Sequence, residues 1–382
     1  MTTIELLLPA LIVASGFWIY YRLPVSDKPW SILLNGLSGF LVSREHKGRP
    51  TPIPQFTTDM RYQGTTPPPN TSNKHGEIEY LDGDIPVIHW YEEVRGSVFH
   101  FVTAGNPANE AVVIVPGLPE SWWAFHHQIV DLSSDYYVIA VDSKGYGQSD
   151  KRLYLDYTNP GMAEDMAALV DKLGIKQFNM MGHDRGAVVT DHMTNVASLK
   201  GRILRYVRMQ QSFNEPHGKP VPPHHIMKTK FGEALFRSRN FVSFIYRAWF
   251  PSNLSESTLQ RLEYEFSFKG TAAAMRKYFE TTDFGVELND RHNTLFNAMT
   301  MPMLLLQGQY DKGQHPEEYG QSPAFVTDAR VQFIHANHFL HLENPVATNR
   351  AIRKFFTEVK VADKPESKRN RVKAKEQAAE AS

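Results

Sequence analysis

The sequence predicts an open α/β fold built on a mostly parallel sheet. From about residue 77 onward, short apolar runs alternate with longer segments of helical character, and this alternation is typical of repeated βαβ units. The expected strands are rich in Val, Ile, Leu, Met or aromatic side chains and comprise residues 97–103, 111–115, 136–141, 178–181, 203–209, 303–306 and 331–334. Ligands bind at the carboxyl ends of the strands in such sheets, so residues that follow these strands are the first candidates for a site.

The gap between the fifth and sixth strands is too long for a simple connection. It contains helical patterns at residues 231–247, 255–268 and 271–279, which predict a helical insertion that roofs the site as a lid. The whole chain then divides into an anchor at residues 1–22, an irregular arm at 23–76, the α/β core at 77–212 and 299–360, the helical lid at 213–298 and a polar tail at 361–382.

Composition excludes several classes of protein and of chemistry. Hydrophobic residues make up 42% of the 382 residues and aromatic residues 12%, which is enough apolar surface for a packed core. Lys and Arg total 41, as do Asp and Glu, so no overall field favours nucleic acid. The chain has no Cys, which excludes disulfides, thiolate metal sites and a cysteine nucleophile. Covalent catalysis must therefore use oxygen or nitrogen.

Residues 4–21 are almost wholly apolar and end in an aromatic cluster. A helix needs about 20 apolar residues to cross a bilayer, so we expect a single-pass membrane anchor that contacts lipid. The alternatives are a cleaved signal peptide and a buried helix. Basic side chains follow the apolar run and none precedes it, so we expect the bulk of the chain on the cytosolic side.

A candidate nucleophile follows the strand at residues 178–181, in the sequence Gly182-His183-Asp184-Arg185-Gly186. A Gly-x-nucleophile-x-Gly turn between a strand and a helix holds its central residue in a strained conformation. The central residue here is Asp184, and a carboxylate can attack a saturated carbon to form an ester. The alternative is that Asp184 only caps the following helix.

Two more residues complete a candidate triad. Asp311 follows the strand at residues 303–306, and His338 follows the strand at residues 331–334. The chain order nucleophile, acid, histidine is that of the α/β-hydrolase triad. His338 would be the general base and Asp311 its orienting partner.

With these motifs, residues 97–356 resemble the α/β-hydrolases of the epoxide hydrolase and haloalkane dehalogenase group, and most of all the membrane-anchored epoxide hydrolases. Residues 115–122 resemble the group's oxyanion loop, residues 142–150 its Gly-rich loop, and residues 338–345 the stretch around its catalytic histidine. Two positions depart from the family pattern. Pro116 replaces the usual His, and Asn337 replaces a Gly whose left-handed backbone conformation Asn tolerates.

The resemblance favours epoxide hydrolases within the group, because their nucleophile turn often reads Gly-His-Asp-x-Gly. Haloalkane dehalogenases hold the leaving halide with a Trp and often an Asn at positions that match Arg185 and Leu118 here. Fluoroacetate dehalogenases carry a second Arg at the position of Val188. The side chains that cradle a halide and the second Arg that binds a carboxylate are therefore both missing from this chain.

The resemblance also implies the role of each site residue. The expected catalytic residues are Asp184, His338, Asp311 and the lid acid Tyr278; the backbone N–H groups of Leu118 and Arg185 form the oxyanion hole; Tyr246 and Trp122 contact substrate, with Tyr264 as an alternative second lid tyrosine. No cofactor or metal is expected, because the spacing of His335, His338 and His341 lacks accompanying carboxylates.

The predicted protein is a cofactor-independent epoxide hydrolase. It converts a small lipophilic epoxide to a vicinal diol through an aspartyl ester. The alternatives are a haloalkane dehalogenase-like hydrolase with the same nucleophile, and a non-catalytic protein that binds a small lipophile in the same fold.

Overall fold

The structure, a computed structural model, describes residues 73–82, 84–209, 222–237, 241–249, 252–311, 326 and 328–359. These residues form one sheet whose strands are β1 (Ile78–Leu81), β2 (Ile85–Val94), β3 (Ser97–Ala104), β4 (Ala111–Val115), β5 (Tyr137–Val141), β6 (Phe178–His183), β7 (Ile203–Met209), β8 (Met303–Gly308) and β9 (Ala329–Ile334). Their spatial order is β1-β2-β3-β5-β4-β6-β7-β8-β9.

The sheet is mostly parallel, as predicted. β1, β2 and β3 pair antiparallel, and β3 is antiparallel to β5. From β5 to β9 every neighbouring pair is parallel. All seven predicted strands are present, while β1 and β2 were not predicted. The buried side chains of β2 alternate with Glu and other partly exposed residues, so this strand lacks a continuous apolar run.

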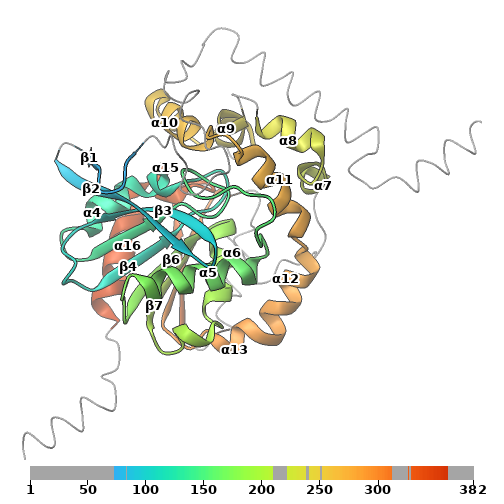
Figure 1. Cartoon of the computed structure of the whole chain (residues 1–382). Coiled ribbons are helices and arrows are strands. Elements are labelled where there is room, and N and C mark those ends of the chain that lie inside the picture. The colour runs from blue at the N-terminus through green and yellow to red at the C-terminus, as the bar shows by residue number, and fades with distance from the viewer. Residues whose placement is uncertain are drawn as a thin grey trace, which may run out of the picture.

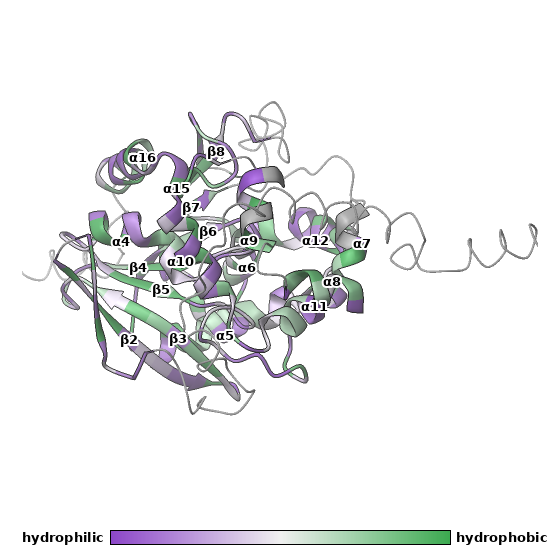
Figure 2. Cartoon of the chain, turned by 90° about the horizontal axis from the view of Figure 1, so that it is seen from above, coloured by the Kyte–Doolittle hydropathy of each residue, from purple (hydrophilic) through white to green (hydrophobic). Residues whose placement is uncertain are grey.

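Helices cover both faces of the sheet (Figure 1). α4 (His126–Leu132) packs with α16 (Pro345–Glu358), and α5 (Asn159–Lys172) packs with α6 (Arg185–Met193). All five residues of β4 are buried between these layers. Figure 2 shows the same division, with green central strands and helices such as α16 that carry one green and one purple side.

A buried ion pair fixes α6 against β7. Arg208 Nη2 lies 2.8 Å from Asp191 Oδ2, and both side chains are fully buried. The hydroxyl of Tyr206 donates to Asp191 Oδ1 at 2.9 Å. Removing one partner of a buried pair costs about 3–5 kcal/mol, so this network holds the helix that begins at the candidate nucleophile.

Helices dominate the described residues between β7 and β8. They are α7 (Pro222–Met227), α8 (Lys230–Phe236), α9 (Phe241–Phe244), the π-helical turn η5 (Ile245–Trp249), α10 (Glu256–Phe266), α11 (Thr271–Thr281), α12 (Phe284–Asp290), a second π-helical turn η6 (Arg291–Leu295) and α13 (Phe296–Ala298). Figure 1 shows α8, α9 and α10 above the core and α11 and α12 along its right side. We call residues 222–298 the helical insertion.

No helix within the described ranges is long and apolar enough to span a bilayer. The predicted anchor at residues 1–22, the predicted tail and all of the predicted arm except residues 73–76 lie outside the described residues.

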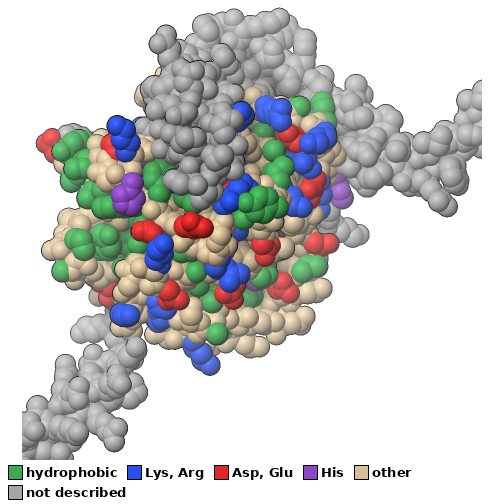
Figure 3. Space-filling model, in the orientation of Figure 1, with side chains coloured by type: hydrophobic (Ala, Val, Ile, Leu, Met, Phe, Trp, Pro, Cys, Tyr) green, Lys and Arg blue, Asp and Glu red, His purple; other side chains and the backbone are tan. Residues whose placement is uncertain are grey.

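On the face in Figure 3, basic and acidic side chains are interspersed.

Candidate active site

The turn between β6 and α6 has the geometry of a nucleophile elbow. Asp184 adopts φ 48° and ψ −121°, a conformation that costs free energy for a residue with a side chain. A Cβ at Gly186 would lie 2.2 Å from the carbonyl oxygen of Val115, and one at Gly117 would lie 2.6 Å from Asp184 Cβ. Only glycine fits at both positions. The side chain of Asp184 does not cap α6.

The structure brings Asp184, His338 and Asp311 together. His338 Nε2 lies 3.4 Å from Asp184 Oδ2, and His338 Nδ1 lies 2.9 Å from Asp311 Oδ2. The N–H of Leu118 donates to Asp184 Oδ1 at 3.0 Å. One carboxylate oxygen of Asp184 is therefore held by the oxyanion loop, and the other faces the imidazole.

This ion pair sets the charges of both side chains. Burial by itself lowers the pKa of His338, but the charge of Asp311 and the hydrogen bonds to Asp184 and Asp311 outweigh it and raise that pKa to about 10. Burial by itself raises the pKa of Asp184, but the hydrogen bond and charge of His338 lower it to about 2. Near neutral pH the resting site holds a carboxylate beside an imidazolium.

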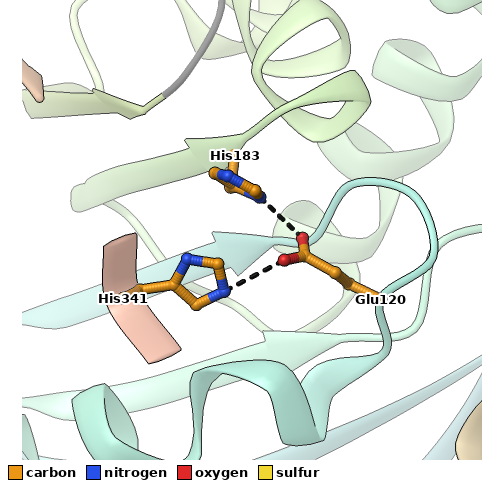
Figure 4. A group of neighbouring side chains, drawn as sticks. All are labelled: Glu120, His183 and His341. Carbon is orange, nitrogen blue, oxygen red and sulfur yellow. Dashed lines mark hydrogen bonds and ion pairs between the residues drawn. The ribbon is translucent and has the colours of Figure 1, made fainter. Parts of the chain in front are cut away.

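A second buried carboxylate, Glu120, ties the oxyanion loop to the elbow. Figure 4 shows ring nitrogens of His183 and His341 pointing at it, with His183 Nδ1 2.8 Å from Oε2 and His341 Nε2 3.0 Å from Oε1. The N–H of Gly117 donates to Oε2 at 2.7 Å, and His183 Nε2 lies 3.0 Å from the carbonyl oxygen of His338. Burial by itself raises the pKa of Glu120, but the charges of the two histidines hold it well below its usual range.

Glu120, His183 and His341 also form a group of possible metal ligands, whose ligand atoms lie within 4.8 Å of one another. The nitrogen–oxygen distances are those of direct hydrogen bonds between the partners. The three-residue spacing of His335, His338 and His341 does not produce a cluster, because the His335 ring packs edge-on against Tyr310, with centroids 4.9 Å apart.

Three buried phenols lie near the nucleophile. The oxygen of Tyr278, on α11, accepts from Arg185 Nε at 2.5 Å, and burial raises the pKa of Tyr278 to about 12. Tyr246, on η5, has its ring centroid 4.0 Å from that of Phe339. The hydroxyls of Tyr246 and of Tyr146, in the Gly-rich loop, are buried and have no hydrogen-bond partner among the described residues. Burial raises the pKa of both well above its usual range, and the charge of Asp184 adds to the effect.

The rings of Trp122 and Tyr264 both lie near the guanidinium of Arg261. The Trp122 ring is fully buried, with its centroid 5.3 Å from that of His89. The guanidinium of Arg261 lies 5.7 Å from the Trp122 centroid and 5.5 Å from the Tyr264 centroid. These contacts give no support to the predicted role of Trp122 in substrate binding.

The left-handed conformation expected at Asn337 is wrong. The described non-glycine residues with positive φ are Asp82, Arg95 and Asp184. The N–H of Asn337 instead donates to Glu343 Oε2 at 2.7 Å, so a carboxylate of α15 (Leu340–Glu343) fixes the backbone before His338.

Sequence analysis assigned no role to several residues of this site. Tyr146 and Glu120 lie inside the Gly-rich loop and the oxyanion loop, so their place in these two motifs was the available signal. Glu287, on α12, carries no motif, yet it makes an ion pair with Arg185. Only the packing of the helical insertion on the elbow reveals that pair.

A family model described as the alpha/beta hydrolase fold matches residues 110–345 of this chain. This range contains all of the candidate triad. It begins at β4 and ends at the start of α16.

Curated relatives include several epoxide hydrolases. Epoxide hydrolase 3 of Xenopus tropicalis is 24% identical over 320 residues, which cover 75% of this chain and 80% of that protein. Epoxide hydrolase 4 of Mus musculus is 32% identical over 104 residues, so the matched part spans 26% of this chain and only 29% of that protein. The solved epoxide hydrolase VrEH1 of Vigna radiata matches with TM-score 0.58 and 22% identity, over 72% of this chain and 99% of that one. The solved structure is similar in fold, and the relatives together support a hydrolase.

Proposed function

We propose that this chain, which belongs to the alpha/beta hydrolase fold family, is an epoxide hydrolase that forms an ester on Asp184. The observation that carries the proposal is the Asp184–His338–Asp311 arrangement, with His338 Nε2 3.4 Å and Nδ1 2.9 Å from the two carboxylates. A serine at the elbow would take an acyl group, whereas a carboxylate takes an alkyl group.

In the first step Asp184 Oδ2 attacks an epoxide carbon. Oδ2 is the attacking atom because Oδ1 accepts the N–H of Leu118. The carbon–oxygen bond of the ring breaks, and the departing oxygen takes the phenolic proton of Tyr278. Tyr246 supplies a second buried phenol, whose hydroxyl has no partner among the described residues, to bind the same oxygen. This step leaves an uncharged ester and a phenolate.

In the second step His338 activates water against the ester carbonyl. Loss of the Asp184 charge removes one of the influences that raise the pKa of His338, so its proton passes through solvent to the phenolate. The neutral imidazole then takes a proton from water as hydroxide attacks Cγ of Asp184. The N–H groups of Leu118 and Arg185 stabilise the oxyanion. The Cγ–Oδ2 bond then breaks, and Oδ2 leaves on the product as an alkoxide that takes the proton of the new carboxyl group. The diol departs and leaves Asp184 as a carboxylate beside protonated His338.

The side chain of Arg185 argues against a carboxylate substrate. Its Nη1 donates to Glu287 Oε2 at 3.1 Å, and its Nη2 makes a second contact to the same carboxylate. The guanidinium is thus already neutralised by the protein. A haloalkane substrate is the second candidate, since it needs the same nucleophile, but Arg185 and Leu118 provide no side-chain cradle for halide.

The helical insertion serves as the lid in this proposal, because α11 and α12 supply Tyr278 and Glu287 to the elbow. The apolar stretch at residues 4–21 supports a membrane anchor, with lipid as its partner and the catalytic domain in the cytosol. Such an anchor favours lipophilic epoxides, which concentrate in the bilayer beside the site.

The test is diol formation by the full chain across a panel of aryl, terpenoid and fatty-acid epoxides. We expect diol from at least one class, with a loss of about 10⁴-fold or more in the Asp184→Asn variant. A parallel assay of chloride release from haloalkanes separates the second candidate. Binding of a lipophilic epoxide without any turnover would instead support the non-catalytic alternative.

A further inference from the structure

The side chain of Arg185 is directed at the lid acid rather than at open space. Arg185 is the first residue of α6, follows the nucleophile directly and is 6% exposed. Its Nε donates to the oxygen of Tyr278 at 2.5 Å. The residue is therefore in direct contact with the group that the proposed function uses as its acid.

Two further residues close a network around this contact. The hydroxyl of Tyr278 lies 3.2 Å from Asn159 Oδ1, and Asn159 Nδ2 donates to Glu287 Oε1 at 2.8 Å. Glu287 in turn pairs with the guanidinium of Arg185. We call Arg185, Tyr278, Glu287 and Asn159 the acid network.

Each hydrogen bond in the acid network fixes a proton. Arginine can only donate, so the Tyr278 oxygen is an acceptor toward Arg185 and the phenolic proton points to Asn159 in the resting state. To protonate an epoxide oxygen, the phenol must turn this proton from Asn159 to substrate. The hydrogen bond from Arg185 to the Tyr278 oxygen remains when the phenolic proton turns. Once the phenolate forms, both the donor and the acceptor of this hydrogen bond are charged, which strengthens it.

We propose that Arg185 is a positioning residue that holds the Tyr278 oxygen in place and stabilises the phenolate formed when Tyr278 protonates the opening epoxide. This inference rests on the proposed function. Glu287 keeps the guanidinium in that orientation, and Asn159 holds the phenolic proton until substrate arrives.

The charges around Tyr278 are consistent with this role. Burial raises the pKa of the phenol, Arg185 lowers it, and Glu287 and Asp184 raise it further. A second buried phenol, Tyr146, interacts electrostatically with Tyr278. The loop that carries Tyr146 lies close to α11, because a Cβ at Gly145 would lie 3.0 Å from Met275 Cε. Among these charged groups on the elbow and on α12, Arg185 alone favours the phenolate.

The first test is a double-mutant cycle on the rate of ester formation, measured in single turnovers. We expect Arg185→Gln to slow ester formation on the order of 10²-fold, with ester hydrolysis unchanged. Arg185→Lys, which keeps the charge, should recover part of the rate. Without the Tyr278 hydroxyl, Arg185→Gln should cause no further loss of rate, so the double variant should be no slower than Tyr278→Phe alone.

A substrate series distinguishes this role from a structural one. The effect of Arg185→Gln should shrink for epoxides whose alkoxide leaving group is weakly basic, because these need less help from an acid. Equal losses in both steps, or additive losses in the double variant, would overturn the proposal. If Arg185→Gln fails to fold because buried Glu287 loses the Arg185 partner of its ion pair, the variant Arg185→Gln/Glu287→Gln replaces it in the cycle.

A second measurement needs no substrate, so it separates this inference from the proposed function. Ultraviolet titration of the phenols, with the Tyr278→Phe spectrum subtracted, reports the ionisation of Tyr278. We expect that ionisation to move to higher pH in Arg185→Gln. An unchanged titration overturns the inference even if epoxides are hydrolysed, whereas a shifted titration with no epoxide turnover sinks the proposed function alone.

Discussion

At the scale of single residues, the candidate base His338 is protonated in the resting site, before the hydrolysis step in which it would accept a proton. His338 lies between two carboxylates, Asp184 and Asp311, and their combined influence raises its pKa to about 10 despite burial. A base that is protonated at rest cannot react prematurely with water. In the proposed mechanism, formation of the ester removes one of the two carboxylate charges and thereby prepares His338 for the second step.

This charge state predicts how stability depends on pH. A pKa raised from 6.5 to about 10 stabilises the folded state fully below pH 6.5, and the contribution is lost as pH rises toward 10. The pKa of Asp184, lowered from 3.8 to about 2, contributes above pH 3.8 and is lost as pH falls toward 2. The difference in unfolding free energy between wild type and His338→Gln should therefore be largest at about pH 4–6.5 and shrink in alkali.

Urea denaturation across this pH range provides the measurement. His75→Gln, a change at an exposed histidine, is the matched control and should show no such shrinkage. A wild-type advantage over His338→Gln that grows between pH 7 and 10 would contradict the assigned ion pair.

At the scale of elements, the elbow depends on close backbone approach. The carbonyl oxygen of Val115 occupies the space that a Cβ at Gly186 would need, at 2.2 Å. Gly201 differs from Gly186 in that it has positive φ, at 71°, and nothing within 4 Å of such a Cβ. A substitution at Gly186 therefore tests a steric clash at the site, and a substitution at Gly201 tests backbone strain away from those contacts.

We therefore predict that Gly186→Ala and Gly201→Ala differ in activity. Both should lose stability, about 1–2 kcal/mol for the strained backbone at Gly201 and about 1–3 kcal/mol for the overpacked elbow. Only Gly186→Ala should also reduce the rate of ester formation, because the clash displaces Asp184. Thermal unfolding and single-turnover assays measure the two effects. Full activity in Gly186→Ala would contradict the steric account.

Elements with a strong local pattern were predictable from sequence. The β4 run is apolar at every position and is buried at every position. β2 carries Glu92 and Glu93 after two aromatic residues, and it pairs antiparallel with both β1 and β3. Pairing between distant residues leaves little trace in a single sequence.

At the scale of the whole molecule, the site combines two kinds of residue. Asp184, Asp311 and His338 follow strands, and the Gly-flanked turn around Asp184 together with the chain order of the three made them candidates. Glu287 lies on a helix of the insertion, 102 residues along the chain from its partner Arg185. Its role depends on how the insertion packs on the core, so no local pattern could indicate it.

The proposed anchor also belongs to this scale. We predict that the full chain sediments with membranes and resists extraction by alkaline carbonate, while a variant lacking residues 1–22 stays in the supernatant and keeps its activity toward a water-soluble epoxide. The apolar run at residues 4–21 gives the physical reason. Recovery of the full chain in the supernatant would contradict the anchor without affecting the catalytic proposal.

The central claim is that Asp184 becomes covalently attached to substrate, and mass spectrometry of the His338→Gln variant tests it most directly. After exposure to an epoxide that the wild type hydrolyses, the peptide that contains Asp184 should gain the mass of that epoxide, and Asp184→Asn/His338→Gln should gain none. An unmodified Asp184 peptide in His338→Gln, under conditions where the wild type forms diol, would contradict the account.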